Sequence, residues 1–356
     1  MVKRLLGDFR WGILPVPGRV LAVIFFVVLF LFPLITQALV GKNSGGIMFT
    51  FTLTCVYAIF AVSWDLLSGY SGQVSFGHAL CFGSGAYISA ILYLHLHWPP
   101  AATIPIATVG AALVGVVTCF PALRLRAPYI SLLTMALPVI LEEVIKELPR
   151  EWAGGKYGIA HIPPLAPTST GTYYICLIVM AASVLIMWKL TDAGSRYIRT
   201  GLIFHAIRED EIAARATGIN TIRYKILAFA FSGFFAGLAG ALIAHVANGA
   251  SPDHFSLVMS FNAIIWVVFG GIVSIYGAVV GAFTLSPLMD FLSAQQPAIA
   301  SYRTLIVTVL IIVILLFMPE GIAVWIRDKI ERECPRCKLG NVAWRKECRA
   351  CGAPLH

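Results

Sequence analysis

The stretch Ile226–Val246 reads ILAFAFSGFFAGLAGALIAHV and holds no Asp, Glu, Lys or Arg. As an α-helix it would be about 30 Å long, which matches the hydrocarbon core of a bilayer. Five further runs are similarly apolar: Val20–Val40, Met48–Leu67, Ala101–Pro121, Gly171–Leu190 and Tyr302–Met318. The whole chain is 12% charged, whereas soluble domains average about 25%. The sequence therefore predicts an all-α polytopic membrane protein.

Basic residues are concentrated in four groups, at 3–19, 124–126, 189–225 and from 327 onward. These groups hold 21 of the 26 Lys and Arg residues. Cytoplasmic loops of membrane proteins collect Lys and Arg. Because the charges flank apolar runs rather than gather on one soluble module, we expect a lipid bilayer around the chain and no nucleic-acid partner.

A cytoplasmic N-terminus and strict alternation give about ten transmembrane helices. The predicted spans are 20–40, 47–67, 76–94, 101–121, 128–147, 171–190, 224–246, 257–273, 276–292 and 302–324. All four basic groups and both termini then lie in the cytoplasm, as expected for a multi-pass protein of the cell inner membrane. No A-x-A site follows the first run, so we expect a retained span and not a cleaved signal peptide. Two assignments are left undecided by the sequence. The third span is rich in Gly, and 257–292 is either two spans or one kinked segment.

The predicted cytoplasmic loop 191–223 carries a short polar helix. His205–Asn220 reads HAIREDEIAARATGIN, which predicts a helix over Ile207–Thr217 that stops at Gly218. Its candidate contact residues are Arg208, Glu209, Asp210, Glu211, Ala213, Ala214 and Gly218. Such a helix either docks into a groove of a soluble partner or lies solvated at the interface.

Several motifs of the chain resemble those of ABC-importer permeases. Ala213-Ala214-x3-Gly218 is similar to their "EAA" loop, although Ile212 stands where that motif has Glu. WDLLSGYSGQVSFGHA at 64–79 and AGLAGA at 236–241 resemble the LivM-type branched-chain amino acid permease subunit. The resemblance covers roughly residues 45–325. Urea and short-amide permeases share these motifs, so the solute stays open.

The resemblance implies a transport subunit and not an enzyme. It implies a second, LivH-type permease subunit, two cytoplasmic ABC ATPases and an extracytoplasmic substrate-binding protein as partners. It also implies that the segment Arg208–Gly218 couples the permease to the ATPases. The chain has no G-x-x-x-x-G-K-[ST] phosphate loop. We therefore expect no nucleotide on this chain and ATP hydrolysis on separate subunits.

The segment Gly69–Gly85 carries five glycines, which a plain helix tolerates poorly. Broken helices inside a bilayer line cavities or lie buried in protein, and transporters often bind solute there. The candidate substrate-path residues are Tyr70, Gln73, Ser75 and His78. Close helix packing is the alternative. It is the simpler interpretation for Gly233-x3-Gly237 and Gly277-x3-Gly281.

Two polar residues of this region have plainer interpretations. His78 alone is better explained as a hydrogen-bonded interior histidine than as a ligand. Asp65 ends its span, where it faces water or a neighbouring helix end.

Four of the eight cysteines form a C-terminal pair of knuckles, Cys334-x2-Cys337 and Cys348-x2-Cys351. Four thiolates at this spacing predict a structural zinc ion. Disulfides would require an oxidising compartment, and a rubredoxin-like iron site uses the same spacing. The other four, Cys55, Cys81, Cys119 and Cys176, are expected to act as small apolar residues in spans.

We therefore predict a permease domain over 1–325 and a cytoplasmic zinc-ribbon-like tail over 326–356. Two rival classes are a membrane-anchored metal-binding sensor and an ion-driven secondary transporter. Ten spans exceed what an anchor needs. An ion-driven transporter typically carries charges deep in its spans, and few are present here.

Overall fold

The computed structural model describes residues 16–40, 45–123, 127–192 and 199–294, with isolated positions between 305 and 325 and two short strands after them. The long helices are α2 (Val16–Val40), α3 (Gly45–Trp64), α4 (Ala79–Leu96), α5 (Pro100–Ala122), α6 (Ala127–Glu147), α8 (Ser169–Thr191), α11 (Thr221–Val246), α12 (Leu257–Gly270) and α13 (Ile275–Ala294). The short elements are the π-helical turn η2 (Asp65–Tyr70), α7 (Arg150–Ala153), η3 (Gly155–Tyr157), β1 (Ile159–Ala160), α9 (Thr200–Glu209), α10 (Glu211–Ala216), β2 (Gly249–Ala250) and η4 (Pro252–Phe255).

Among the residues that the structure describes, six helical stretches are long and apolar enough to cross a membrane. They are Gly45–Tyr70, Ala79–Leu96, Pro100–Ala122, Ser169–Thr191, Thr221–Val246 and Ile275–Leu292. The polytopic class is thus supported, but the ten predicted spans are not confirmed. The predicted segment 257–292 is two helices, of which α12 has only 14 residues. The predicted tenth span, 302–324, lies largely outside the described residues.

Helices α4, α5 and α11 approach one another closely through glycine. A Cβ atom on Gly85 would collide with the carbonyl group of Gly237, and one on Gly240 would collide with that of Phe82. Gly281 lies just as tightly against Trp266 of α12. The interpretation of both glycine motifs as packing surfaces is therefore confirmed.

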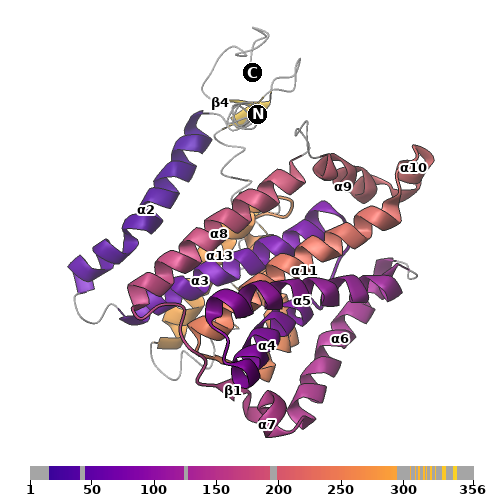
Figure 1. The fold of residues 1–356 in the computed structure, drawn as a ribbon. Coiled ribbons are helices and arrows are strands. Elements are labelled where there is room, and N and C mark those ends of the chain that lie inside the picture. The colour runs from indigo at the N-terminus through magenta and orange to yellow at the C-terminus, as the bar shows by residue number, and fades with distance from the viewer. Residues whose placement is uncertain are drawn as a thin grey trace, which may run out of the picture.

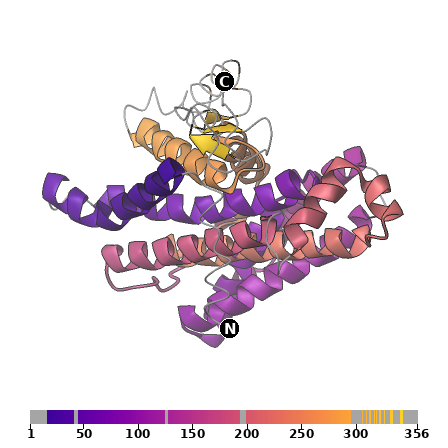
Figure 2. The ribbon, with the colours of Figure 1, turned by 90° about the horizontal axis from the view of Figure 1, so that it is seen from above.

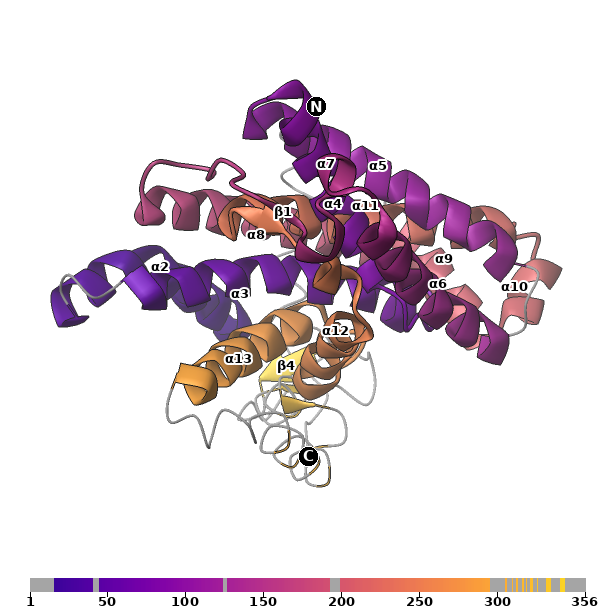
Figure 3. The ribbon, with the colours of Figure 1, turned by 90° about the horizontal axis from the view of Figure 1, so that it is seen from below.

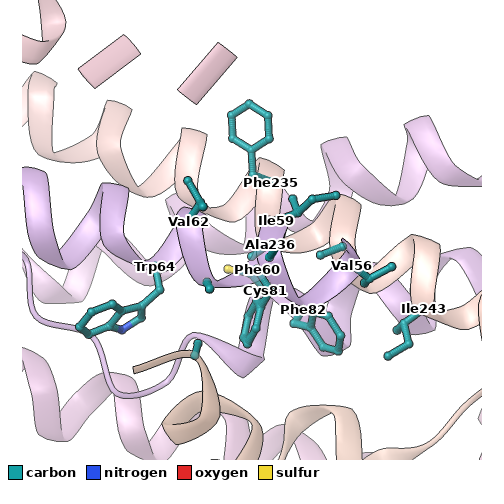
Figure 4. Close-up of a cluster of buried hydrophobic side chains, with 14 of the residues drawn as sticks. Val56, Ile59, Phe60, Val62, Trp64, Cys81, Phe82, Phe235, Ala236 and Ile243 are labelled. Carbon is teal, nitrogen blue, oxygen red and sulfur yellow. The ribbon is translucent and has the colours of Figure 1, made fainter. Parts of the chain in front are cut away.

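The core lies where α3, α4 and α11 meet. Phe60 of α3 and Phe82 of α4 are fully buried, with ring centroids 4.7 Å apart. Figure 4 shows them beside Cys81, with Ala236 of α11 close by. The four cysteines of the helices, Cys55, Cys81, Cys119 and Cys176, are buried free thiols, as their position in spans predicts.

The helices α12 and α13 form a pair on one side of the bundle. Figure 3 shows this pair on one side of α3 and α11, with α5 on the other, and Figure 2 shows the orange α13 along the same side. The peptide between them, 271–274, makes the turn from one helix to the other.

The two ends of the bundle carry different short elements (Figure 1). At one end, here the α9 end, lie α9, α10 and the start of α11. At the other, here the β1 end, β1 pairs antiparallel with β2, in register Ile159 with Ala250. The carbonyl group of Trp152 in α7 contacts His95 near the end of α4, so α4 ends at the β1 end. This pairing ties the segment between α6 and α8 to the end of α11.

Candidate functional site

Helix α3 does not continue into α4. It passes into the π-helical turn η2, and residues 71–78 form no helix before α4 begins at Ala79. Gly72 has φ 71°, a left-handed conformation that glycine adopts most easily. The predicted helix break is thus confirmed for 69–78. Gly83 and Gly85 instead lie in regular helix and serve packing, Gly83 against the ring of Phe255.

The broken segment lies well inside the bundle. The His78 Nε2 atom lies 2.8 Å from the Ser63 hydroxyl, and the Ser63 carbonyl accepts a 2.9 Å hydrogen bond from Ser232 of α11. Ser63 precedes Tyr70 by two helical turns, and Ser232 follows Thr221 by three. At 1.5 Å per residue, His78 lies about 10 to 17 Å from the α9 end.

Side chains replace the missing helical hydrogen bonds of this segment. The amides of Ser75, Phe76 and Ala79 donate to the hydroxyls of Ser68, Thr134 and Ser260 at 3.2, 3.2 and 3.0 Å. The carbonyls of Gln73, Val74 and Ser75 accept from Ser68, Ser131 and Trp64 at 3.2, 3.1 and 2.7 Å. Backbone groups away from water require such partners. The break is therefore built into the fold by η2, α3, α6 and α12.

The four predicted path residues do not gather at one point. Tyr70 lies at the α9 end, edge-on to His205 of α9 with ring centroids 5.4 Å apart. Gln73 donates a 3.4 Å hydrogen bond to the Ser71 carbonyl. His78 is buried, bonded to Ser63 and stacked on Phe60 with centroids 5.0 Å apart. The interpretation of His78 as a satisfied interior residue is confirmed.

Ser75 and His78 line a small cavity. Thr118 of α5, Thr134 of α6 and Ser232 of α11 complete its polar lining. Its space suits one or two water molecules, and an amino acid would not fit. In this conformation the cavity is no solute site, so the substrate-path role of these residues stays a prediction.

Asp65 links the break after α3 to the turn between α12 and α13. Its fully buried carboxylate accepts hydrogen bonds from the amides of Val273 and Ser274, at 2.8 and 3.1 Å, just before α13 begins. A carboxylate at the positive end of a helix is favourable. Gly69 leaves room for it, because a Cβ atom there would collide with the Asp65 side chain. Of the two predicted surroundings of Asp65, the neighbouring helix end is confirmed.

The polar loop forms two helices, so the predicted single helix over Ile207–Thr217 is wrong. Helix α9 ends at Glu209 and α10 begins at Glu211. Asp210 separates them because its carboxylate accepts from the amides of Ile212 and Ala213, at 2.8 and 3.0 Å. This is an N-cap, and Asp is a preferred residue there. The predicted stop is confirmed, since Gly218 has φ 86° directly after α10.

Glu211 ties α10 to the start of α11. Its carboxylate contacts Arg215 at 2.5 Å and Lys225 at 2.8 Å, and accepts a 3.2 Å hydrogen bond from Thr221. Partial burial raises the pKa of the Glu211 carboxyl, but Lys225 and Arg215 outweigh it and hold that pKa below its ordinary value. The group is therefore ionised at neutral pH, and α10 is fixed to α11 by charge.

The end of α9 contacts the broken segment directly. A Cβ atom on Gly72 would lie 3.2 Å from the Cα atom of Arg208. His205, one turn earlier, packs on Tyr70, and burial together with Arg208 lowers its pKa. One face of α9 thus touches the turn at 70–72.

The remaining loop residues divide between two faces of α10. Ala214 is buried within the chain, whereas Ala213 is exposed. The expected contact of both with a partner stays a prediction. Ile212 is 81% exposed. Glu209 is exposed at the end of α9. The available face of α10 therefore carries Ile212 and Ala213.

The zinc prediction falls on residues that the structure does not describe. Cys334, Cys337, Cys348 and Cys351 lie outside the described residues, as do Arg124 and Arg126. Strands β3 (Glu331–Glu333) and β4 (Gly340–Val342) pair antiparallel, and in sequence they flank the first Cys-x2-Cys pair. Elsewhere, the described residues hold no group of three or more His, Cys, Asp or Glu side chains suited to a metal ion.

Comparison with known proteins gives a consistent set of relatives. The LivM permease protein of the high-affinity branched-chain amino acid transport system of Escherichia coli K12 is 27% identical over 85% of this chain and 74% of its own length. The LivH permease protein of the same organism is 26% identical over 76% of this chain and 92% of its own. The galactofuranose transporter permease YtfT matches only 27% of each chain, at 30% identity. No solved structure matches.

The family comparison agrees with the helix arrangement. The family described as branched-chain amino acid transport system / permease component matches residues 46–315, from the start of α3 to beyond α13. Its members are transport subunits and not enzymes. The chain belongs to the permease component family of branched-chain amino acid transport systems.

Proposed function

We propose that this chain is one of two permease subunits of an ABC importer for branched-chain amino acids, driven by ATP hydrolysis on separate subunits. The observation that carries the proposal is the double attachment of the α9–α10 element. Glu211 binds it to α11 through Lys225, and Arg208 lies against the broken segment at Gly72. A displacement of this element therefore acts on two parts of the membrane bundle at once.

The element also offers a surface to a soluble partner. Ile212 on α10 and Leu202 on α9 are 81% and 54% exposed, and Ile212 follows Glu209, Asp210 and Glu211 in sequence. Exposed apolar side chains with a polar rim are typical of interaction sites. We assign this surface to a cytoplasmic ABC ATPase. Two such ATPases, a LivH-type second permease and an extracytoplasmic binding protein complete the proposed importer.

The orientation follows from the same assignment. If α9 and α10 meet an ATPase, the α9 end is cytoplasmic. With about ten spans in the inner membrane, both termini and the four basic groups are then cytoplasmic as well. The β1 end, with α7 and β1, then faces the binding protein. Labelling of cysteines introduced beside Lys156 and Arg208 should report opposite sides. Labelling from one side only would contradict this orientation.

We propose that the tail 326–356 is a zinc ribbon. The pairing of β3 with β4 supports this, because Cys334 and Cys337 fall between these strands in sequence. The four thiolates would hold a structural zinc ion and supply the folding energy of a tail too short for a core of its own.

The decisive experiment is reconstitution of the complete importer in lipid vesicles. We expect ATP-dependent uptake of leucine, isoleucine and valine, with hydrolysis stimulated by the loaded binding protein. Urea and acetamide serve as competing solutes, because their permeases share the sequence motifs. Uptake of either amide in place of leucine would overturn the substrate assignment, and uptake without ATP would overturn the importer class.

A further inference from the structure

Asp253 lies inside the bundle and not above it. Helix α12 starts at Leu257 and has 14 residues, so it spans about 21 Å of a hydrocarbon core that is about 30 Å thick. Its last residue, Gly270, precedes the peptide 271–274, whose Val273 amide binds Asp65, five residues before Tyr70 at the α9 end. The turn η4 precedes the other end of α12, on the side of the β1 end. Phe255 of η4 packs against Gly83 of α4, several turns below the end of that helix.

The Asp253 carboxylate has no cationic partner in the part of the chain that the structure describes. Its recorded side-chain hydrogen bond is with the Ser251 hydroxyl, at 3.0 Å. The residue is nevertheless exposed. A carboxylate at this depth is costly against lipid and typically marks a solute or ion path. Asp253 therefore faces water or a charged ligand when the importer works.

Tyr87 adds an unused hydrogen-bonding group to the same place. Its side chain is 3% exposed, and its hydroxyl has no hydrogen-bond partner among the described residues. The ring lies 5.5 Å from that of Phe255, centroid to centroid, and the Asp253 carboxylate is close enough to act electrostatically on the hydroxyl. Buried hydroxyls are normally paired, so this one is free to bond a water molecule or a ligand.

The surroundings suit an aliphatic amino acid. Val258 and Phe261, one turn apart on α12, are 67% and 40% exposed. They continue an apolar face directly from η4. The first amides of α12 lie at the positive end of that helix, which favours a carboxylate. Negative, positive and apolar groups thus follow one another along the nine residues 253–261.

We propose that Asp253 receives the ammonium group of the transported amino acid on the β1 side of the path, with Tyr87 as a second ligand and Val258 against the aliphatic side chain. This inference rests on the proposed function and deepens it, since urea and neutral amides carry no ammonium group for Asp253 to bind.

The test uses the reconstituted importer with labelled leucine. We expect Asp253→Asn to lower uptake at least tenfold and Asp253→Glu to retain a substantial part of it. Tyr87→Phe should raise the KM for transport several-fold. Glu143→Gln, which neutralises a 64% exposed carboxylate of α6, is the matched control and should transport normally.

The outcomes separate the inference from the proposed function. Normal leucine uptake by Asp253→Asn would overturn the inference alone. So would loss of the second permease on purification of that variant, because Asp253 would then serve subunit assembly. If the unmodified importer moves no leucine, the proposed function and this inference both fail.

Discussion

Gly72 and Arg208 are in backbone contact across the break that follows α3: a Cβ atom on Gly72 would lie 3.2 Å from the Cα atom of Arg208. The pair joins the turn at 70–72 to the last turn of α9. Both partners are near chain reversals, so neither can move far without carrying the other.

Gly72→Ala should therefore uncouple the importer. The methyl group meets Arg208, and the left-handed backbone costs a non-glycine residue about 1–2 kcal/mol. We expect leucine uptake to fall at least fivefold while the subunits still assemble. Gly46→Ala is the matched control, because nothing lies within 4 Å of a Cβ atom there. Equal uptake by both variants would show that this contact transmits nothing.

Glu211 should be needed for coupling more than for stability. Glu211→Gln removes the charge that holds Arg215 and Lys225, yet partly exposed ion pairs contribute only about 1 kcal/mol or less. We expect near-normal thermal unfolding in detergent and a several-fold loss of uptake per ATP hydrolysed. A variant that loses both in parallel would point to a folding role instead.

The pH dependence of this contact follows from the sign of the shift. The pKa of Glu211 lies below its ordinary value, so the contact is complete above that ordinary value and is lost only as the pH falls through the lowered one. Between pH 6 and 8 the ratio of uptake to hydrolysis should not change through Glu211. If the ratio of uptake to hydrolysis changed with pH in this range for the native importer but not for Glu211→Gln, Glu211 would not be the ionised group described here.

Asp65→Ala should destabilise the bundle strongly. It leaves the buried amides of Val273 and Ser274 without an acceptor, and each unsatisfied group costs about 1–3 kcal/mol. Asp65→Asn keeps one acceptor oxygen and should cost less. The midpoint of thermal unfolding of the purified complex should be highest for the native protein, lower for Asp65→Asn and lowest for Asp65→Ala. Equal midpoints for alanine and the native residue would mean that the two breaks are held together by other contacts.

Local features of this fold were predictable, and distant pairings were not. The break at 69–78, the stop at Gly218 and the glycine packing surfaces follow from residue type, because glycine has few other uses in a bilayer. The partners of Asp65 lie more than 200 residues away, and no local pattern indicates them. The split at Asp210 was missed, although Asp before a short Ala-rich run is an N-cap signal.

The span count and the candidate site also show that local sequence patterns predict some features and miss those that depend on distant contacts. Counting apolar runs treats each as a full crossing, so it cannot recognise that α12 has only 14 residues. The candidate path residues were chosen for polarity inside a glycine-rich segment. Tyr70 contacts His205 of α9, and His78 contacts Ser63 of α3. The residues that stabilise the break, Ser68, Thr134 and Ser260, look like ordinary helix residues in sequence.

The C-terminal tail should bind one zinc ion per chain, as expected of a four-thiolate site. Metal analysis of the purified protein should detect it, and replacing Cys334 and Cys337 by serine should remove it. Serine replacement of Cys119, a buried thiol of α5, is the control that should leave the metal in place. A metal content unaffected by the paired change would exclude the zinc ribbon.

The exposed face of α10 should determine ATPase binding. Ile212→Glu replaces an 81% exposed apolar side chain with a charge that a hydrophobic groove rejects. It lies outside the core, so the permease should fold and pair normally. We expect co-purification of the ATPases to fall about tenfold, the loss expected when one buried anchor of an interface is removed. Ile222→Glu, at another exposed apolar position near the start of α11, is the matched control. Equal ATPase recovery with both variants would show that α10 lies beside the docking surface and not within it. The contacts of Glu211 and Arg208 with the bundle would then transmit no motion from an ATPase.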